Sequence, residues 1–172
     1  GINVGGRHKV VMEEFCRELE ELGMSHVSSY INSGNLFFDS TLMKEELLLV
    51  LEKFLNKTYP FIKVFSLFTL EDYQNEVASL PKWWEDDFYR KDVLLYTERL
   101  DKNEMRNIIE SLELGDEIIH LGQLGIYWGK FDKSSYNQTA YHKKLLKAPF
   151  YPSITIRNAR TFSKIGQFLR MK

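Results

Sequence analysis

The sequence predicts an α+β protein made of two tandem ferredoxin-like units, each with the element order β-α-β-β-α-β and an antiparallel sheet. Two observations support this prediction. Apolar residues at helical spacing alternate with β-branched and aromatic runs, and the order of these segments starts again in the second half of the chain. We expect the first unit at residues 1–80, a linker at 81–91, and the second unit with a C-terminal helix at 92–172.

In the first series, apolar residues at every third or fourth position predict amphipathic helices, and turn formers between two β-prone runs predict a hairpin. The expected elements are a helix at 12–22, strands at 27–31 and 36–38, a helix at 45–57 and a buried strand at 62–68. The strand that opens a complete unit has its place before Gly1, and we expect it to be missing or truncated.

The second series contains every element of the unit. After a further helix at 70–80, which still belongs to the first unit, the expected elements are a strand at 92–96, a helix at 103–112, strands at 118–121 and 126–128, a short helix at 140–147 and a strand at 154–156. A terminal helix follows. Thr161 is predicted as its N-cap, because a threonine side chain can accept a hydrogen bond from an open N–H group of the first turn.

The composition fits a folded protein in a reducing compartment. Of the 172 residues, 44% are hydrophobic, which is enough for sizeable cores. No apolar stretch approaches the roughly 20 residues that a bilayer requires, so we expect no membrane partner. Cys16 is the single cysteine, which excludes an intrachain disulfide and favours a cytoplasmic location.

Charge is distributed unevenly along the chain. Residues 133–172 contain nine Lys or Arg and no acidic residue, so the other 14 basic residues and all 24 acidic residues lie in 1–132. The two parts therefore carry formal charges of −10 and +9 in chain order. This asymmetry fits either an anionic partner or the mutual attraction of two parts of one protein.

Three short motifs resemble one family. Gly1-Ile2-Asn3-Val4-Gly5-Gly6, Tyr30-Ile31-Asn32-Ser33-Gly34-Asn35 and Thr155-Ile156-Arg157-Asn158-Ala159-Arg160-Thr161 are similar, in this order, to the signature segments of the bacterial domain-of-unknown-function family 1697. The resemblance implies a cytosolic protein of two ferredoxin-like halves, with no established catalytic residues or substrate. The sequence lacks the apolar opening strand of that family, and Ala159 stands where a bulky aromatic residue is frequent.

The third motif holds the strongest candidate binding residues, Arg157, Asn158, Arg160 and Thr161. They stand where a strand ends and a helix begins. A helix start carries partial positive charge and open N–H donors, and arginine forks match phosphate or carboxylate geometry. The alternative, slightly favoured by the charge asymmetry, is that the arginines pair with carboxylates of the acidic part and fix the two units together.

The first two motifs offer weaker candidates for contact with an anion. They are Asn3, Gly5 and Gly6 in the first motif and Asn32, Ser33 and Asn35 in the second. Backbone N–H groups of a glycine-rich segment before a helix can face an anion, and the hairpin turn can offer side-chain donors. In both places a simple turn is the favoured interpretation.

The sequence predicts no cofactor and no metal. The glycines match neither the P-loop nor the dinucleotide-binding spacing. The four histidines, which are His8, His26, His120 and His142, show no metal-ligand spacing. The sequence does not predict an oligomeric state.

Three functions are therefore compared. The leading hypothesis is the binding of a phosphorylated or otherwise anionic small ligand in a cleft between the two units. The second is nucleic-acid binding through the basic C-terminal block, where four aromatic residues precede three lysines: Tyr127, Trp128, Phe131 and Tyr136, then Lys143, Lys144 and Lys147. The third is an enzyme acting on a phosphorylated metabolite, although the sequence places no obvious titrating group beside the arginines.

Overall fold

The computed structural model describes residues 2–3 and 8–170, and among these it has an α+β architecture with two antiparallel sheets and six α-helices. The chain forms two compact units. The smaller unit comprises residues 1–63 and 167–172, and the larger unit comprises residues 64–166. Residues 81–91, predicted as a linker, lie inside the larger unit.

The smaller unit confirms the predicted helices and hairpin. Its elements are α1 (Met12–Glu21), β1 (Ser25–Tyr30), β2 (Asn35–Asp39) and α2 (Lys44–Thr58). The two strands form an antiparallel sheet in which Tyr30 pairs with Asn35. Its core is built from Phe15 and Leu19 of α1, Phe37 of β2, and Leu51 and Leu55 of α2, all of which are buried.

The predicted strand at 62–68 is wrong, because within the part of the chain that the structure describes these residues form no strand and pair with none. Most of their side chains are half-buried, and the Ser66 hydroxyl donates a hydrogen bond to the Tyr96 carbonyl at 2.5 Å. Apolar and β-branched composition favours extended backbone, but a strand also needs a partner that local sequence does not supply. The duplication of the β-α-β-β-α-β unit over the whole chain therefore stays a prediction.

The larger unit contains a four-stranded sheet. Its elements are α3 (Leu70–Ser79), β3 (Arg90–Tyr96), α4 (Lys102–Glu110), β4 (Glu117–Leu121), β5 (Gly125–Lys130), α5 (Ala140–Lys144), β6 (Ile154–Asn158) and the start of α6 (Ala159–Arg170). The strand order is β4-β5-β3-β6, and every neighbouring pair is antiparallel. Residues 90–158 therefore have the predicted order β-α-β-β-α-β.

Short 3-10 helices lie between the longer elements of this unit. They are η1 (Lys82–Glu85), η2 (Tyr136–Gln138), η3 (Leu145–Lys147) and η4 (Tyr151–Ser153). The helix predicted at 140–147 is thus α-helical only to Lys144 and continues as η3. This short helical segment, with η2 before it, covers the end of the sheet that carries the candidate site.

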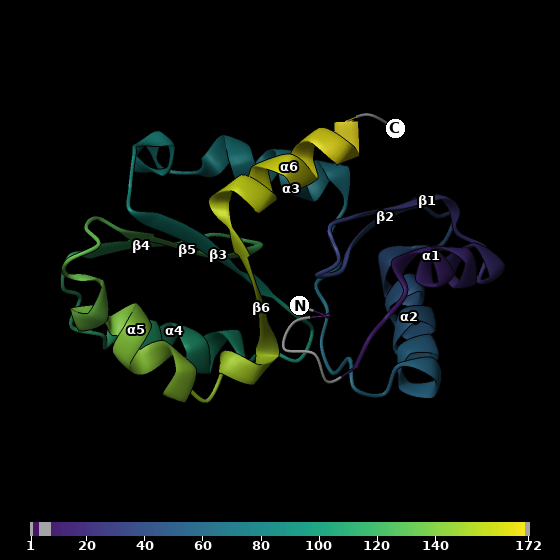
Figure 1. Ribbon diagram of the computed structural model, residues 1–172, viewed down its shortest axis with the longest axis horizontal. Coiled ribbons are helices and arrows are strands. Elements are labelled where there is room, and N and C mark those ends of the chain that lie inside the picture. Colours follow the sequence, from purple (N-terminus) through teal and green to yellow (C-terminus); the bar gives the residue numbers. More distant parts are fainter. Residues whose placement is uncertain (1, 4–7, 171–172) are drawn as a thin grey trace. The chain divides into compact units, whose positions relative to one another are not determined.

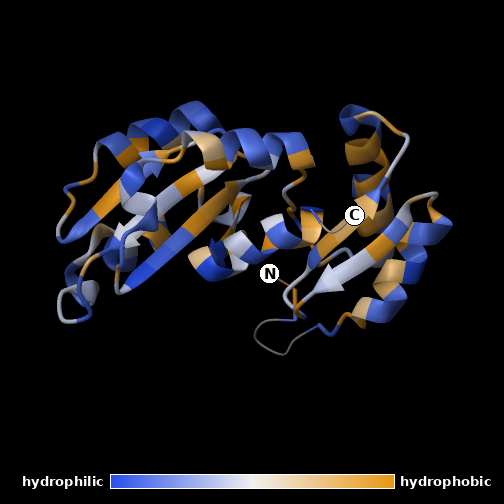
Figure 2. Cartoon of the chain, turned by 90° about the horizontal axis from the view of Figure 1, so that it is seen from above, coloured by the Kyte–Doolittle hydropathy of each residue, from blue (hydrophilic) through white to orange (hydrophobic). Residues whose placement is uncertain are grey.

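Helices cover both faces of the large sheet, with α3 and α6 on one face and α4 and α5 on the other (Figure 1). On the α4 and α5 face, Leu94, Ile126 and Trp128 form the centre of the main apolar core. On the other face, the Phe162 ring lies 5.6 Å from the Tyr127 ring. Figure 2 shows apolar stretches along the strands of this sheet. Among the described residues, no helix combines the length and apolar character needed to cross a bilayer.

Candidate functional site

The sheet face that packs on α4 and α5 is apolar in its middle and charged at one end. On β3, Arg90 and Asp92 share the face of Leu94, because side chains alternate along a strand. On β5, Lys130 shares the face of Trp128 for the same reason. The register pairs Arg90 with Lys130 and Asp92 with Trp128, so the charged groups of both strands meet at this end.

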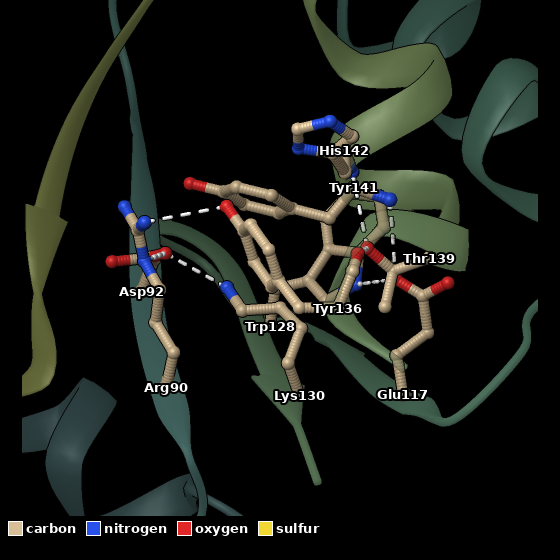
Figure 3. A network of polar contacts seen from close by, with 9 residues as sticks. All are labelled: Arg90, Asp92, Glu117, Trp128, Lys130, Tyr136, Thr139, Tyr141 and His142. Carbon is tan, nitrogen blue, oxygen red and sulfur yellow. Dashed lines mark hydrogen bonds and ion pairs between the residues drawn. The ribbon is translucent and has the colours of Figure 1, made fainter. Parts of the chain in front are cut away.

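Asp92 joins two cationic side chains in this polar cluster (Figure 3). The Lys130 Nζ and the Arg90 Nε each donate a hydrogen bond to Asp92 Oδ2, both at 2.7 Å. The side chains of Lys130 and Asp92 are 0% and 1% exposed, whereas that of Arg90 is 45% exposed. The cluster therefore extends from the interior to the surface through Arg90.

Two tyrosines enclose these cations. The Lys130 Nζ lies 3.6 Å from the centroid of the Tyr141 ring, and the Arg90 Nη1 donates to the Tyr136 hydroxyl at 3.3 Å. Burial, and then the negative charge of Asp92, raises the pKa of the Tyr141 hydroxyl. Burial lowers the pKa of Lys130 to about 8, because loss of hydration disfavours the charged amine more than Asp92 favours it.

Glu117 on β4 fixes the segment that covers the cluster. Its carboxylate accepts hydrogen bonds from the Trp128 Nε1 at 2.7 Å, from the Tyr141 N–H at 3.1 Å and from the Ala140 N–H. A carboxylate at the start of α5 satisfies N–H groups that have no partner within the helix. Glu117 thus positions Tyr141 over Lys130.

β6 brings the third motif beside this polar cluster. Asn158 is the register partner of Asp92, and Arg157 is the register partner of Val93. Asn158 therefore lies on the charged face of the sheet and Arg157 on the opposite face. The buried Arg157 guanidinium donates to the Thr155 hydroxyl and to the carbonyl of residue 156, both at 2.9 Å, and burial lowers its pKa.

The N-cap of α6 is Asn158, so the prediction of Thr161 as the cap is wrong. The Thr161 N–H donates to Asn158 Oδ1 at 2.8 Å, and α6 begins at Ala159. Asparagine and threonine are both good caps, and the strand runs two residues further than the pattern predicted. Asn158 and Arg160 are exposed, Thr161 is buried, and among the described residues Arg160 takes part in no ion pair.

Asn3 joins the first motif to the hairpin turn within the smaller unit. Its Nδ2 donates to the Val10 carbonyl at 2.8 Å and to the Asn32 carbonyl at 3.1 Å. Its Oδ1 accepts from the Val10 N–H at 2.7 Å. The Asn3 side-chain amide therefore uses both its nitrogen and its oxygen to bond to backbone groups, as the backbone of a neighbouring strand would.

The turn itself is held in the same way. The Ile2 N–H donates to the Ser33 carbonyl at 3.2 Å, and the Asn35 Nδ2 donates to the Tyr30 carbonyl at 3.0 Å. The structure thus brings Asn3 together with the turn residues. Gly5 and Gly6 lie outside the described residues.

Sequence reasoning missed Asp92 and Lys130 as site residues. The sequence did contain a signal for them. Each is a charged residue that stands two positions from a buried apolar residue and therefore shares its face of the strand. Asp92 precedes Leu94, and Lys130 follows Trp128. A charge that continues the apolar face of a buried strand needs a partner, and here the partners lie 38 residues apart in sequence.

The fold and the site define an α+β protein with an antiparallel β-α-β-β-α-β sheet and a buried polar cluster at one end. The chain belongs to the family described as "Protein of unknown function (DUF1697)", whose model matches residues 1–127. This match confirms the resemblance seen in the sequence. It ends before Lys130 and Asn158.

A solved structure resembles the whole chain. It is described as the structure of conserved bacterial protein SP0830 from Streptococcus pneumoniae, with 57% sequence identity and a TM-score of 0.96. The similarity covers 98% of this chain and 94% of that chain. No curated protein matches the sequence.

Proposed function

We propose that the protein binds a phosphorylated or otherwise anionic small ligand at the end of the large sheet, in contact with Arg90, Asn158 and Arg160. The observation that carries this proposal is the register pairing of Asp92 with Asn158. Asn158, an exposed residue of the third motif, is thereby two positions along the strand pair from Arg90, whose guanidinium Asp92 and Tyr136 already orient. A group fixed before binding loses less conformational entropy when the ligand arrives.

The charges at this end of the sheet favour an anion. Inside the cluster the cations Arg90 and Lys130 are matched by two buried carboxylates, but the Arg90 side chain is 45% exposed, so the charge that reaches the surface is positive. Arg160 adds a further charge in the first turn of α6, where the helix dipole is also positive. Arginine side chains can bind phosphate or carboxylate oxygens with two parallel hydrogen bonds.

The other predicted site residues have different parts in this proposal. Arg157 and Thr161 support the segment, through bonds to neighbouring groups of β6 and to Asn158. Participation of Asn3, Gly5, Gly6, Asn32, Ser33 and Asn35, and the cleft between the units, stay predictions. The proposed site does not require them.

The two alternative functions have unequal support. Tyr127 and Trp128 are fully buried, so their rings are closed to the base stacking that a single-strand platform needs. This burial counts against base stacking on these two rings, whereas Phe131 is exposed and Tyr136 is half-buried. An enzyme gains support from Lys130, because it supplies a titrating group close to the third motif.

A thermal-shift screen tests the proposal, with nucleotides, sugar phosphates, carboxylates and short oligonucleotides as probes. Ligand at a hundred times its Kd stabilises the folded chain by about 2.7 kcal/mol. We expect one small anion to raise the Tm, and Arg160→Ala and Arg90→Gln each to remove the rise. Arg99→Ala is the matched control, because this exposed arginine follows the opposite end of β3.

A substitution at Asn158 can distinguish its role as the N-cap of α6 from its proposed contact with the ligand. Aspartate caps a helix as well as asparagine does, so Asn158→Asp should preserve the Tm of the free protein while it repels an anion. Loss of the ligand-induced rise in this variant supports the site. An unchanged rise in all three variants places the ligand elsewhere, and a response to oligonucleotides alone favours the second hypothesis.

A further inference from the structure

The polar cluster contains a competition between two cations. The Lys130 Nζ and the Arg90 Nε both donate to one oxygen, Oδ2 of Asp92, at 2.7 Å. Lys130 is sealed in the interior, whereas Arg90 reaches the surface. A change at the exposed guanidinium therefore acts on the buried amine through the carboxylate that they share.

The surroundings of Lys130 determine how it responds. Asp92 and Arg90 face it from β3, Glu117 from β4, Tyr141 from α5 and Tyr136 from η2, and His142 follows on the outer side of α5. Glu117 is engaged by Trp128 and by the first N–H groups of α5 in either state of the amine. The raised pKa of Tyr141 keeps its hydroxyl neutral at physiological pH. Lys130 is thus the group of the cluster that changes charge near pH 8.

We infer that Lys130 is a proton switch beneath the proposed anion site, and that it takes up a proton from solvent when an anion binds to Arg90. This inference rests on the proposed function. The anion competes with Asp92 for the Arg90 guanidinium and adds negative charge at this end of the sheet. Both effects favour the ammonium form of Lys130, whose amine lone pair accepts the proton and whose charge then pairs with Asp92.

The coupling has a defined sign. Because binding and protonation favour each other, anion affinity must fall as the pH rises through the pKa of Lys130, about 8. Above this pH Asp92 pairs with the charge of Arg90 alone, and below it Lys130 adds its own positive charge to the cluster. The binding site is then strongest at neutral or lower pH.

Nuclear magnetic resonance of the full chain with labelled lysine and arginine side chains tests this directly. The Lys130 signal is identified by the ring-current shift that Tyr141 produces at 3.6 Å, so no substitution is needed for its assignment. The probe is inorganic sulfate, which keeps its two negative charges between pH 6 and 10. We expect Lys130 to titrate near pH 8, and sulfate to raise the midpoint by about one pH unit, as an added nearby charge does.

Arg90→Gln removes the competing cation. In this variant the Lys130 midpoint should move up without sulfate and should no longer respond to it. Arg106→Gln, on the exposed face of α4, is the control and should behave as the unmodified chain does. A Lys130 midpoint above pH 10, or one that sulfate leaves unmoved while the Arg160 signals shift, overturns the proton switch alone. If neither Lys130 nor Arg160 responds to sulfate, the proposed anion site fails, and the inference fails with it.

Discussion

Asn158 and Asp92 are partners across two antiparallel strands, yet Asn158 is exposed and Asp92 is 1% exposed. This pair marks the point where the large sheet passes from the interior to the surface. On the inner side, Asp92 compensates the charge of Lys130. On the outer side, Asn158 caps α6 and presents the third motif. A change in the polar cluster should therefore be detected both in stability and in the proposed binding.

Removal of Asp92 should cost far more stability than removal of Lys130. Asp92→Asn leaves a buried amine without its carboxylate, and loss of one partner from a buried ion pair costs roughly 3–5 kcal/mol. Lys130→Met leaves Asp92 bonded to Arg90, so we expect a loss of about 1 kcal/mol. Urea unfolding measures both.

The double variant Asp92→Asn with Lys130→Met is the control for this comparison. It removes both charges and should recover at least 1 kcal/mol relative to Asp92→Asn alone, because an uncompensated charge is no longer buried. Strictly additive losses would show that the two residues do not act as a pair.

The stability of the protein should rise with pH between about 8 and 10. The pKa of Lys130 is lowered in the folded chain from 10.5 to about 8, so the unfolded chain binds more protons across this window. The free energy of unfolding should increase by on the order of 2 kcal/mol as the buried charge is lost. Urea unfolding at pH 7, 8, 9 and 10 measures the slope.

Lys130→Met serves as the reference for that slope. Tyrosines oppose this rise in stability above pH 10, because the pKa of the half-buried Tyr96 is raised to about 12 and the unfolded chain loses phenolic protons first. The variant retains these tyrosines and lacks the lysine. Equal slopes in the two proteins would assign the pH dependence to other groups.

Local patterns predicted the elements but not their partners. The 3.6-residue and two-residue periods identify α1, α2, α4 and the strands of the large sheet, because such periods depend on a few neighbouring side chains. Residues 62–68 have the composition of a strand and pair with none, since pairing is decided by segments far along the chain. The cap of α6 was misplaced for a related reason, because the pairing with β3 extends β6 to Asn158.

The candidate site was predictable only in part. The third motif was expected beside a helix N-terminus, and Asn158 and Arg160 do lie at the start of α6, where both are exposed. Arg157 belongs to the other face of the sheet, and that alternation is fixed only once the register is known. The pairing of Lys130 with Asp92 requires β5 to lie beside β3, and no local sequence pattern predicts that neighbourhood.

Glu117→Gln should destabilise the protein although it keeps the shape of the side chain. The Glu117 carboxylate accepts hydrogen bonds from Trp128, Ala140 and Tyr141, and an amide places an NH₂ group against some of these donors. Loss of a charged acceptor for buried donors costs roughly 2–3 kcal/mol. The measurement is urea unfolding followed by tryptophan fluorescence. Glu113→Gln, at an exposed position nearby, should change the free energy of unfolding by less than about 0.5 kcal/mol.

Gly34 should tolerate alanine less well than Gly23 does. Both glycines have positive φ, +86° at Gly34 and +95° at Gly23. Backbone strain therefore makes alanine cost about 1 kcal/mol at either position. A Cβ at Gly23 meets no atom within 4 Å, whereas one at Gly34 lies 2.7 Å from the Ile2 Cγ1. We therefore expect a loss of about 1 kcal/mol for Gly23→Ala and about 2–3 kcal/mol for Gly34→Ala, measured by urea unfolding.

The excess cost at Gly34 should come from Ile2. Gly34→Ala in an Ile2→Ala background should lose only the backbone term, because the clash is then gone. The contact joins the first motif to the hairpin turn, beside the hydrogen bond from the Ile2 N–H to the Ser33 carbonyl. If Gly34→Ala costs the same with and without the Ile2 side chain, the two motifs are not packed as the structure describes. A difference of about 1 kcal/mol or more would establish in solution that they form one structural element.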